Sequence, residues 1–135
     1  MISVSEALDH LFGLATPLGI ETVSLLDAHR RVLAHDIAAQ REQPPFDGSA
    51  MDGYAVAAAT PGDRLTVIGE AAAGHRFDGR VTEGQAVRIF TGAPVPTGTT
   101  RIIIQEDVQR DGDVIEIGRA LDDNAYIRPA GGDFK

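Results

Sequence analysis

Cysteine is absent from the 135-residue sequence, which excludes disulfide bonds and thiolate metal ligands. A chain without cysteine suits a reducing compartment, and the N-terminal residues show no basic stretch followed by an apolar core of the kind a signal peptide has. No apolar run approaches the roughly 20 residues that cross a bilayer. We therefore expect a cytoplasmic protein that is not embedded in a membrane.

Basic residues are few: 12 Lys and Arg stand against 20 Asp and Glu, and the formal net charge is −8. This balance argues against binding to nucleic acid, which needs Lys and Arg to displace phosphate counterions. It also argues against docking on anionic membranes. An anionic small ligand is still possible, because backbone N–H groups in glycine loops bind anions without side-chain charge.

Aromatic residues are also scarce, at 5 %, with no Trp, so the core must consist mainly of Val, Ile, Leu and Ala. Residues 3–15 are predicted to form an amphipathic helix, in which Ser3 and Glu6 make a capping box. Its apolar face comprises Val4, Ala7, Leu8, Leu11, Phe12 and Ala15.

Further along the chain, the pattern changes from helical to β-like at Gln43-Pro44-Pro45, where two prolines forbid helix. Before this point we expect an extended piece over 21–24, a short helix over 25–31, and an extended strand or linker over 32–39. After it, the candidate strands are residues 65–70, 85–90, 101–108 and 113–118. Asp111-Gly112 lies between two strand patterns and predicts a hairpin.

The segment PPFDGSAMDGYAV, residues 44–56, gathers two carboxylates, two glycines and a hydroxyl in a loop that enters a strand. Such a loop can hold a carboxylate against a ligand, while glycine lets the backbone approach it closely. The alternative is an ordinary turn in which Asp47 and Asp52 accept hydrogen bonds from their own backbone. Chemistry alone favours the turn.

A second segment, RIFTGAPVPTG, spans residues 88–98 and passes from a strand into a proline-restricted loop. Thr91 could donate to an anionic oxygen beside the Gly92 amide, although spacing alone favours a simple strand-end turn. No Lys-Ser or Lys-Thr follows the glycines, so this is not a P-loop, and no G-x-G-x-x-G fingerprint occurs.

A third segment, NAYIRPAGGD, spans residues 124–133 near the end of the chain. Arg128 could pair with a phosphate, and Asp133 could bind Mg²⁺ or orient a ligand. The alternative is a flexible tail. The four histidines are scattered and make no H-x-H or H-E-x-x-H pattern, so a histidine metal site is not indicated.

Taken together and in this order, the segments resemble the molybdopterin molybdenumtransferases, known as MoeA in bacteria and as the E domain of gephyrin in animals. PPFDGSAMDGYAV is similar to that family's PPFDNSAMDGYAV-type hallmark, and LLDAHRRVLAHDI, RIFTGAPVPTGTTRIIIQE and NAYIRPAGGDFK resemble its other segments. The resemblance runs from about residue 21 to the end. Gly48 replaces the usual Asn, Thr99-Thr100 the usual Ala-Asp, and Gly132 the usual Glu.

The resemblance implies an enzyme that receives adenylylated molybdopterin and molybdate, places molybdenum on the dithiolene sulfurs and releases AMP with the help of Mg²⁺. The implied catalytic residues are Asp52, Thr91 and Asp133, the implied cofactor-binding residues are Ser49, Gly92 and Arg128, and the implied metal ligands are Asp52 and Asp133. The implied partners are a second copy of the chain, the pterin substrate and the adenylylating enzyme of the same pathway. The alternative is a non-catalytic dimerisation or interaction module, as the gephyrin relative partly is.

The fold implied by the resemblance is mainly β, with coiled and bifurcated sheets and N-terminal helices. Residues 1–42 would form the helices and an extended linker or dimerisation segment, 43–127 a β-rich domain, and 128–135 the start of a segment that returns toward C-terminal domains. Members of the family are longer than this chain by more than one domain, so the isolated chain is expected to be inactive.

Overall fold

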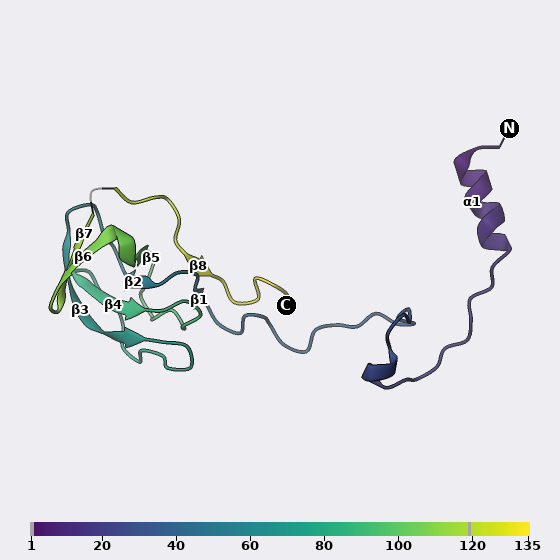
Figure 1. Ribbon diagram of the computed structural model, residues 1–135, viewed down its shortest axis with the longest axis horizontal. Helices are drawn as coiled ribbons and strands as arrows, with labels where there is room; N and C mark the ends of the chain where they lie inside the picture. Colours follow the sequence, from purple (N-terminus) through teal and green to yellow (C-terminus); the bar gives the residue numbers. More distant parts are fainter. Residues whose placement is uncertain (1, 119) are drawn as a thin grey trace. The chain divides into compact units, whose positions relative to one another are not determined.

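The computed structural model describes residues 2–118 and 120–135, and the chain divides into two units. One unit ends at Ala38 and the other comprises Ala39–Lys135. Figure 1 shows the helix of the first unit and the strands of the second.

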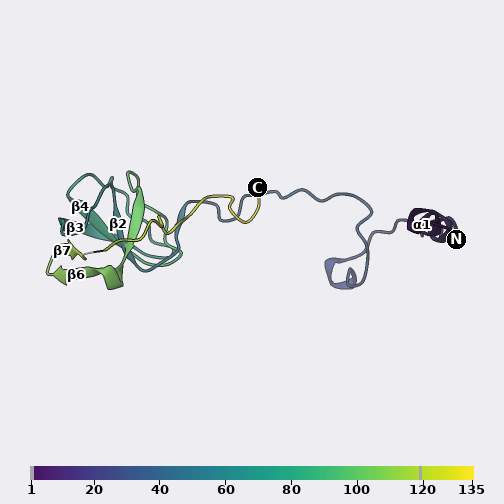
Figure 2. The ribbon, with the colours of Figure 1, turned by 90° about the horizontal axis from the view of Figure 1, so that it is seen from above.

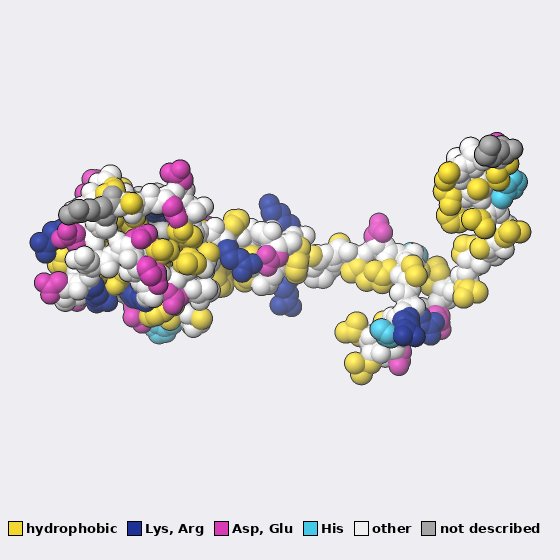
Figure 3. Space-filling model, turned by 45° about the horizontal axis from the view of Figure 1, so that its top comes forward, with side chains coloured by type: hydrophobic (Ala, Val, Ile, Leu, Met, Phe, Trp, Pro, Cys, Tyr) yellow, Lys and Arg dark blue, Asp and Glu magenta, His cyan; other side chains and the backbone are white. Residues whose placement is uncertain are grey.

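The first unit begins with the predicted helix, α1, over Val4–Gly13. The capping box is confirmed: Ser3 Oγ accepts from Glu6 N at 3.2 Å, and Glu6 Oε2 accepts from Ser3 N at 2.7 Å. No side chain of α1 is buried, and Phe12 is 71 % exposed. Apolar side chains therefore cover much of its visible surface in Figure 3. Across the described residues, no helix has the length and apolar character of a membrane span.

The second predicted helix, over residues 25–31, is wrong in extent. Only a 3-10 turn forms there, η1, over Leu25–Asp27. Arg30 has a φ of 62°, in the left-handed region where a right-handed helix cannot continue. Residues 32–39 form no strand, so of the two alternatives for this stretch the linker is the one observed.

The second unit contains a six-stranded and a two-stranded sheet, which confirms the mainly β fold class. The strands are β1 (Gly48–Ser49), β2 (Gly53–Val56), β3 (Arg64–Ala71), β4 (Gln85–Ile89), β5 (Arg101–Ile104), β6 (Val108–Asp111), β7 (Val114–Ile117) and β8 (Ile127–Arg128). The larger sheet has the order β5-β2-β4-β3-β7-β6, and β1 pairs with β8. Among the strands of the described residues, only β3 and β4 are parallel neighbours, and the larger sheet is curled (Figure 2).

Most of the predicted strands are present. β3, β4 and β7 match the candidate ranges, and the Asp111-Gly112 hairpin is confirmed, with Gly112 at a φ of 59° in the turn between β6 and β7. The single strand predicted over 101–108 is wrong, because the 3-10 turn η2, over Gln105–Asp107, divides it into β5 and β6. β2 was not among the candidates, although it lies between β4 and β5.

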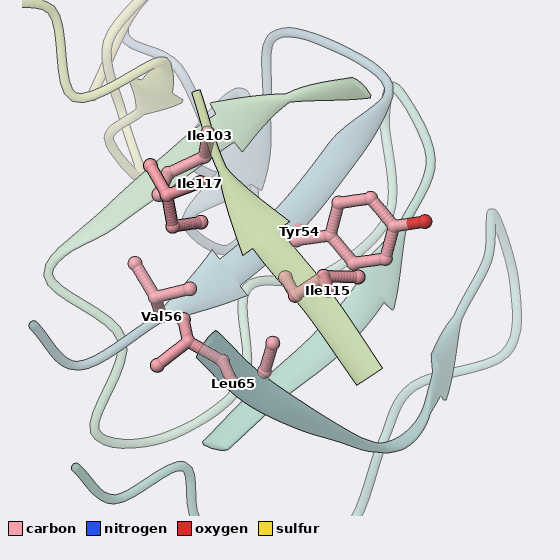
Figure 4. Packing of buried hydrophobic residues seen from close by; sticks show 7 residues of the cluster. Tyr54, Val56, Leu65, Ile103, Ile115 and Ile117 are labelled. Atoms are coloured by element: carbon pink, nitrogen blue, oxygen red, sulfur yellow. The ribbon is translucent and has the colours of Figure 1, made fainter. Parts of the chain in front are cut away.

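Side chains on the two faces of the sheet form two apolar clusters. Because side chains alternate along a strand, Tyr54 and Val56 of β2 enter one cluster while Ala55 enters the other. The first cluster, shown in Figure 4, comprises Tyr54, Val56, Leu65, Ala86, Ile103, Ile115 and Ile117. All four residues of β2 are buried, so this short strand is the centre of the core.

Replacing Gly53 by Ala should destabilise the second unit strongly. A Cβ at this position would lie well inside van der Waals distance of the Ile103 carbonyl on β5. We expect Gly53→Ala to lower the free energy of unfolding by about 2 kcal/mol or more. Gly48→Ala is the matched control, because its Cβ would meet nothing closer than 3.9 Å. Urea titrations measure both, and equal midpoints would contradict the close β2–β5 packing.

The amide hydrogens of α1 should exchange with solvent much faster than those of β2 and β4. A helix of 10 residues without a buried side chain has only its capping box and internal hydrogen bonds to stabilise it. Hydrogen exchange of the dilute chain, followed by NMR, measures this difference. Protection of α1 equal to that of β2 would show that the helix packs against another surface.

Candidate functional site

Asp52 and Thr91 lie together because of the register between β2 and β4. Gly53 pairs with Ile89, so the residue before β2 lies beside the residues that follow β4. Both the backbone N and Oγ1 of Thr91 donate to Asp52 Oδ1, each at 2.7 Å, across 39 residues of sequence. Of the three implied catalytic residues, Asp52 and Thr91 are thus in contact, and the alternative of a self-contained turn at Asp52 is wrong.

The Asp52 carboxyl group is stabilised in its ionised form. The backbone hydrogen bond from Thr91, followed by the hydroxyl hydrogen bond, lowers the pKa of Asp52 below its ordinary value of 3.8. Partial desolvation opposes this shift, and the positive charge of Arg88 adds to it. Both donors of Thr91 are used on Asp52, so in this arrangement Thr91 orients the carboxylate rather than a ligand.

Asp47 joins the first loop to both other segments. Its backbone oxygen accepts from Val95 N at 2.8 Å. Its Oδ1 accepts from Ala130 N at 2.8 Å, across 83 residues. The self-contained turn is therefore wrong for Asp47 as well, and this carboxylate is a structural link between loops.

Ser49 is 1 % exposed and lies where the three segments meet. Its backbone N donates to Ala93 O at 3.0 Å, and its carbonyl accepts from Gly92 N at 2.8 Å. Its hydroxyl donates to Met51 O at 2.6 Å. Through β1, Ser49 also pairs with Ile127 of β8. The hydrogen bonds of Ser49, including the one it accepts from the Gly92 amide, hold the loops together.

Arg128 and Asp133 form an ion pair with each other. Arg128 Nη2 lies 2.8 Å and 3.1 Å from the two carboxylate oxygens of Asp133. The flexible-tail alternative is wrong, because Asp133 N and Gly131 N donate to Gln43 O and Pro44 O, both at 2.8 Å. In the described part of the chain, Asp133 makes no hydrogen bond to Asp52 or Thr91.

Among the described residues there is no group of three or more His, Cys, Asp or Glu side chains that could hold a metal ion. Mg²⁺ commonly takes only one or two protein carboxylates and fills its shell with water and substrate phosphates. The ionised Asp52 fits that role through Oδ2, since Thr91 engages Oδ1. Asp133 does not fit while both its oxygens are bound to Arg128.

Arg88 belongs to this site but was not predicted from the sequence. It is half-buried on β4, and its Nη1 donates to Gly53 O at 3.1 Å. Its guanidinium carbon lies 4.6 Å from the centre of the Phe90 ring and 5.2 Å from that of Tyr54. A single arginine in a strand sequence does not indicate a functional site. The cross-strand pairing of Arg88 with Tyr54 would have been needed to assign Arg88 to the site.

Thr91→Val should raise the pKa of Asp52, because it removes the hydroxyl donor and keeps the backbone donor. Because the pKa of Asp52 is lower in the folded than in the unfolded chain, its ionisation stabilises the fold above pH 3.8. This stabilisation disappears as the pH falls through the pKa of the folded state. The stability difference between the two proteins should therefore be present at pH 7 and shrink below pH 3.8. Denaturant titrations across this range measure it. A difference that is constant with pH would contradict the assignment.

Comparison with known proteins identifies the family of the chain. Molybdopterin molybdenumtransferases from Synechococcus elongatus and Haemophilus influenzae are 37 % and 39 % identical to 100 % and 88 % of the chain. The chain spans 36 % and 30 % of their lengths, about a third.

A crystal structure of the molybdopterin biosynthesis MoeA protein from Pyrococcus horikoshii matches 85 % of this chain with a TM-score of 0.75 and 38 % identity, and the match covers 32 % of that structure. The sequence model of the MoeA N-terminal region, domains I and II, matches residues 2–135. The chain therefore belongs to the MoeA N-terminal region family.

Proposed function

We propose that this chain supplies part of the active site of a molybdopterin molybdenumtransferase. The substrates are molybdate and adenylylated molybdopterin, and the products are the molybdenum-loaded pterin and AMP. Relatives that carry this name support the proposal. Because the chain spans about a third of those relatives, we place the rest of the site on segments outside this sequence.

The observation that carries the proposal is the contact between Asp52 and Thr91. A hydroxyl and an amide donate to one oxygen of an ionised, partly exposed carboxylate, and a glycine follows each of the two residues. A structural turn would not need two long-range donors on one oxygen. This arrangement presents the other oxygen, Oδ2, in a fixed direction, which is what positioning a polar reactant requires.

Asp52 is the proposed positioning group for water, phosphate or a cation, and Thr91 orients it. Mg²⁺ bound at Asp52 would neutralise charge on the phosphate oxygens of the adenylylated substrate. Arg128 is the proposed phosphate contact, since its exposed guanidinium has donors that Asp133 does not use. In this proposal Asp133 holds Arg128 until substrate competes for it, and Ser49 and Gly92 shape the loops around the bound pterin.

A role in association is a second proposed function, favoured by the exposed apolar face of α1. Val4, Leu11 and Phe12 are 79 %, 61 % and 71 % exposed, and large exposed apolar patches mark interaction surfaces. We propose a homodimer for the full-length protein, and the adenylylating enzyme as a further partner. The proposed setting is the cytoplasm, as the cysteine-free sequence suggests.

In the full-length protein, Asp52→Asn should lower the rate of molybdenum insertion by about a hundredfold. The change keeps the volume of the side chain and removes its charge, so stability should fall much less. An assay with adenylylated molybdopterin and molybdate, scored by cofactor formed, measures the rate. Asp113→Asn is the matched control, because Asp113 is exposed and lies on the far hairpin.

Normal cofactor synthesis by full-length Asp52→Asn would contradict the proposed positioning role of Asp52. The isolated 135-residue chain provides a second test, since it should form no cofactor in the same assay. Turnover by the isolated chain at the rate of the full-length protein would show that the site is complete within these residues.

A further inference from the structure

Arg88 is held in one orientation by four contacts. Nη1 donates to Gly53 O at 3.1 Å, and Nη2 donates to Gln105 Oε1 at 2.7 Å. The guanidinium carbon lies over the rings of Tyr54 and Phe90, at 5.2 Å and 4.6 Å from their centres. Aromatic faces attract a guanidinium, and its planar fork loses little freedom when two donors are satisfied. An arginine held in this way is fixed rather than solvated.

Each contact of Arg88 leads to a neighbour of the Asp52–Thr91 pair. Gly53 follows Asp52 directly, and Phe90 precedes Thr91. Gln105, whose side chain Arg88 holds, donates its backbone N to Asp52 O at 3.1 Å. Arg88 is therefore linked to the Asp52 backbone both through Gly53 and through Gln105.

The positive charge of Arg88 is not neutralised by an ion pair. Among the described residues, no carboxylate oxygen lies within the 4.0 Å of its guanidinium nitrogens that defines a salt bridge, although Glu70 is its register partner on β3. The directional contacts of its guanidinium are therefore made with Gly53 O and Gln105 Oε1 rather than with a carboxylate.

We propose that Arg88 is a positioning residue that fixes the Asp52 carboxylate for the ligand by clamping Gly53 and Gln105 on either side of the Asp52 backbone. This inference rests on the proposed function of Asp52. It assigns the positioning to the two-donor fork of the guanidinium, which only arginine supplies.

Two substitutions test the two-donor fork. Arg88→Met removes charge and fork and keeps an apolar stem, whereas Arg88→Lys keeps the charge and removes the fork. Arg64→Met is the control, because Arg64 is an exposed residue on β3 of the same sheet and loses the same charge. The values of kcat and KM are measured on the full-length enzyme, and the free energy of unfolding on the 135-residue chain.

We expect Arg88→Met to lower kcat by about tenfold or more while KM changes much less. Arg88→Lys should lower kcat as well, because an ammonium group cannot bind Gly53 O and Gln105 Oε1 in the same geometry. A purely structural role would lower the free energy of unfolding without this split between kcat and KM. If Arg88→Met does not fold, the Arg88→Lys result decides, and an unchanged kcat in that variant overturns the proposal.

A kcat in Arg88→Met equal to that in Arg64→Met would also overturn the proposal. Failure of the proposed function is seen differently, as normal turnover by Asp52→Asn. If Asp52→Asn is slow while Arg88→Lys has normal kcat, only the positioning role of Arg88 fails, so the two failures can be distinguished.

Discussion

The pairing of β2 with β4 is the constraint on which the candidate site depends. With Gly53 opposite Ile89, Asp52 enters the sheet beside the point where the chain leaves it at Phe90 and Thr91. Burial of β2 on both faces stabilises this pairing. On the other side of β2, Gly53 lets β5 approach closely, because it has no Cβ. Two loops distant in sequence therefore present one carboxylate with two donors on a single oxygen.

The other loop contacts preserve this geometry at the surface. Asp47 and Ser49 connect the first loop to the proline-restricted loop and to the final segment, mostly through backbone hydrogen bonds. Exposed groups such as Arg128 and Asp133 contribute little to stability as an isolated ion pair, because solvent screens them. The hydrogen bonds of buried Ser49 and of Asp47 thus hold the loops, and Arg128 and Asp133 remain able to exchange partners with a ligand.

Much of this fold could be predicted from local pattern. The capping box of α1, the Asp111-Gly112 hairpin and three of the long strands depend on neighbours in sequence, which the sequence displays. A strand was expected after the loop of residues 44–56, but its range could not be given, because four residues buried on both faces show no alternation. The motif resemblance implied one site for Asp52, Thr91 and Asp133. It did not predict that Thr91 uses both donors on Asp52, or that Arg88 lies over two rings, since these depend on register.

The central claim is that Asp52 and Thr91 act as one unit in the proposed reaction. A double-mutant cycle in the full-length enzyme tests this directly, with Asp52→Asn, Thr91→Val and the combination compared by kcat/KM for molybdenum insertion. If Thr91 acts by orienting Asp52, the double variant should be about as slow as Asp52→Asn alone. Losses that multiply independently would contradict the account, because they would mean that each residue contacts the substrate separately.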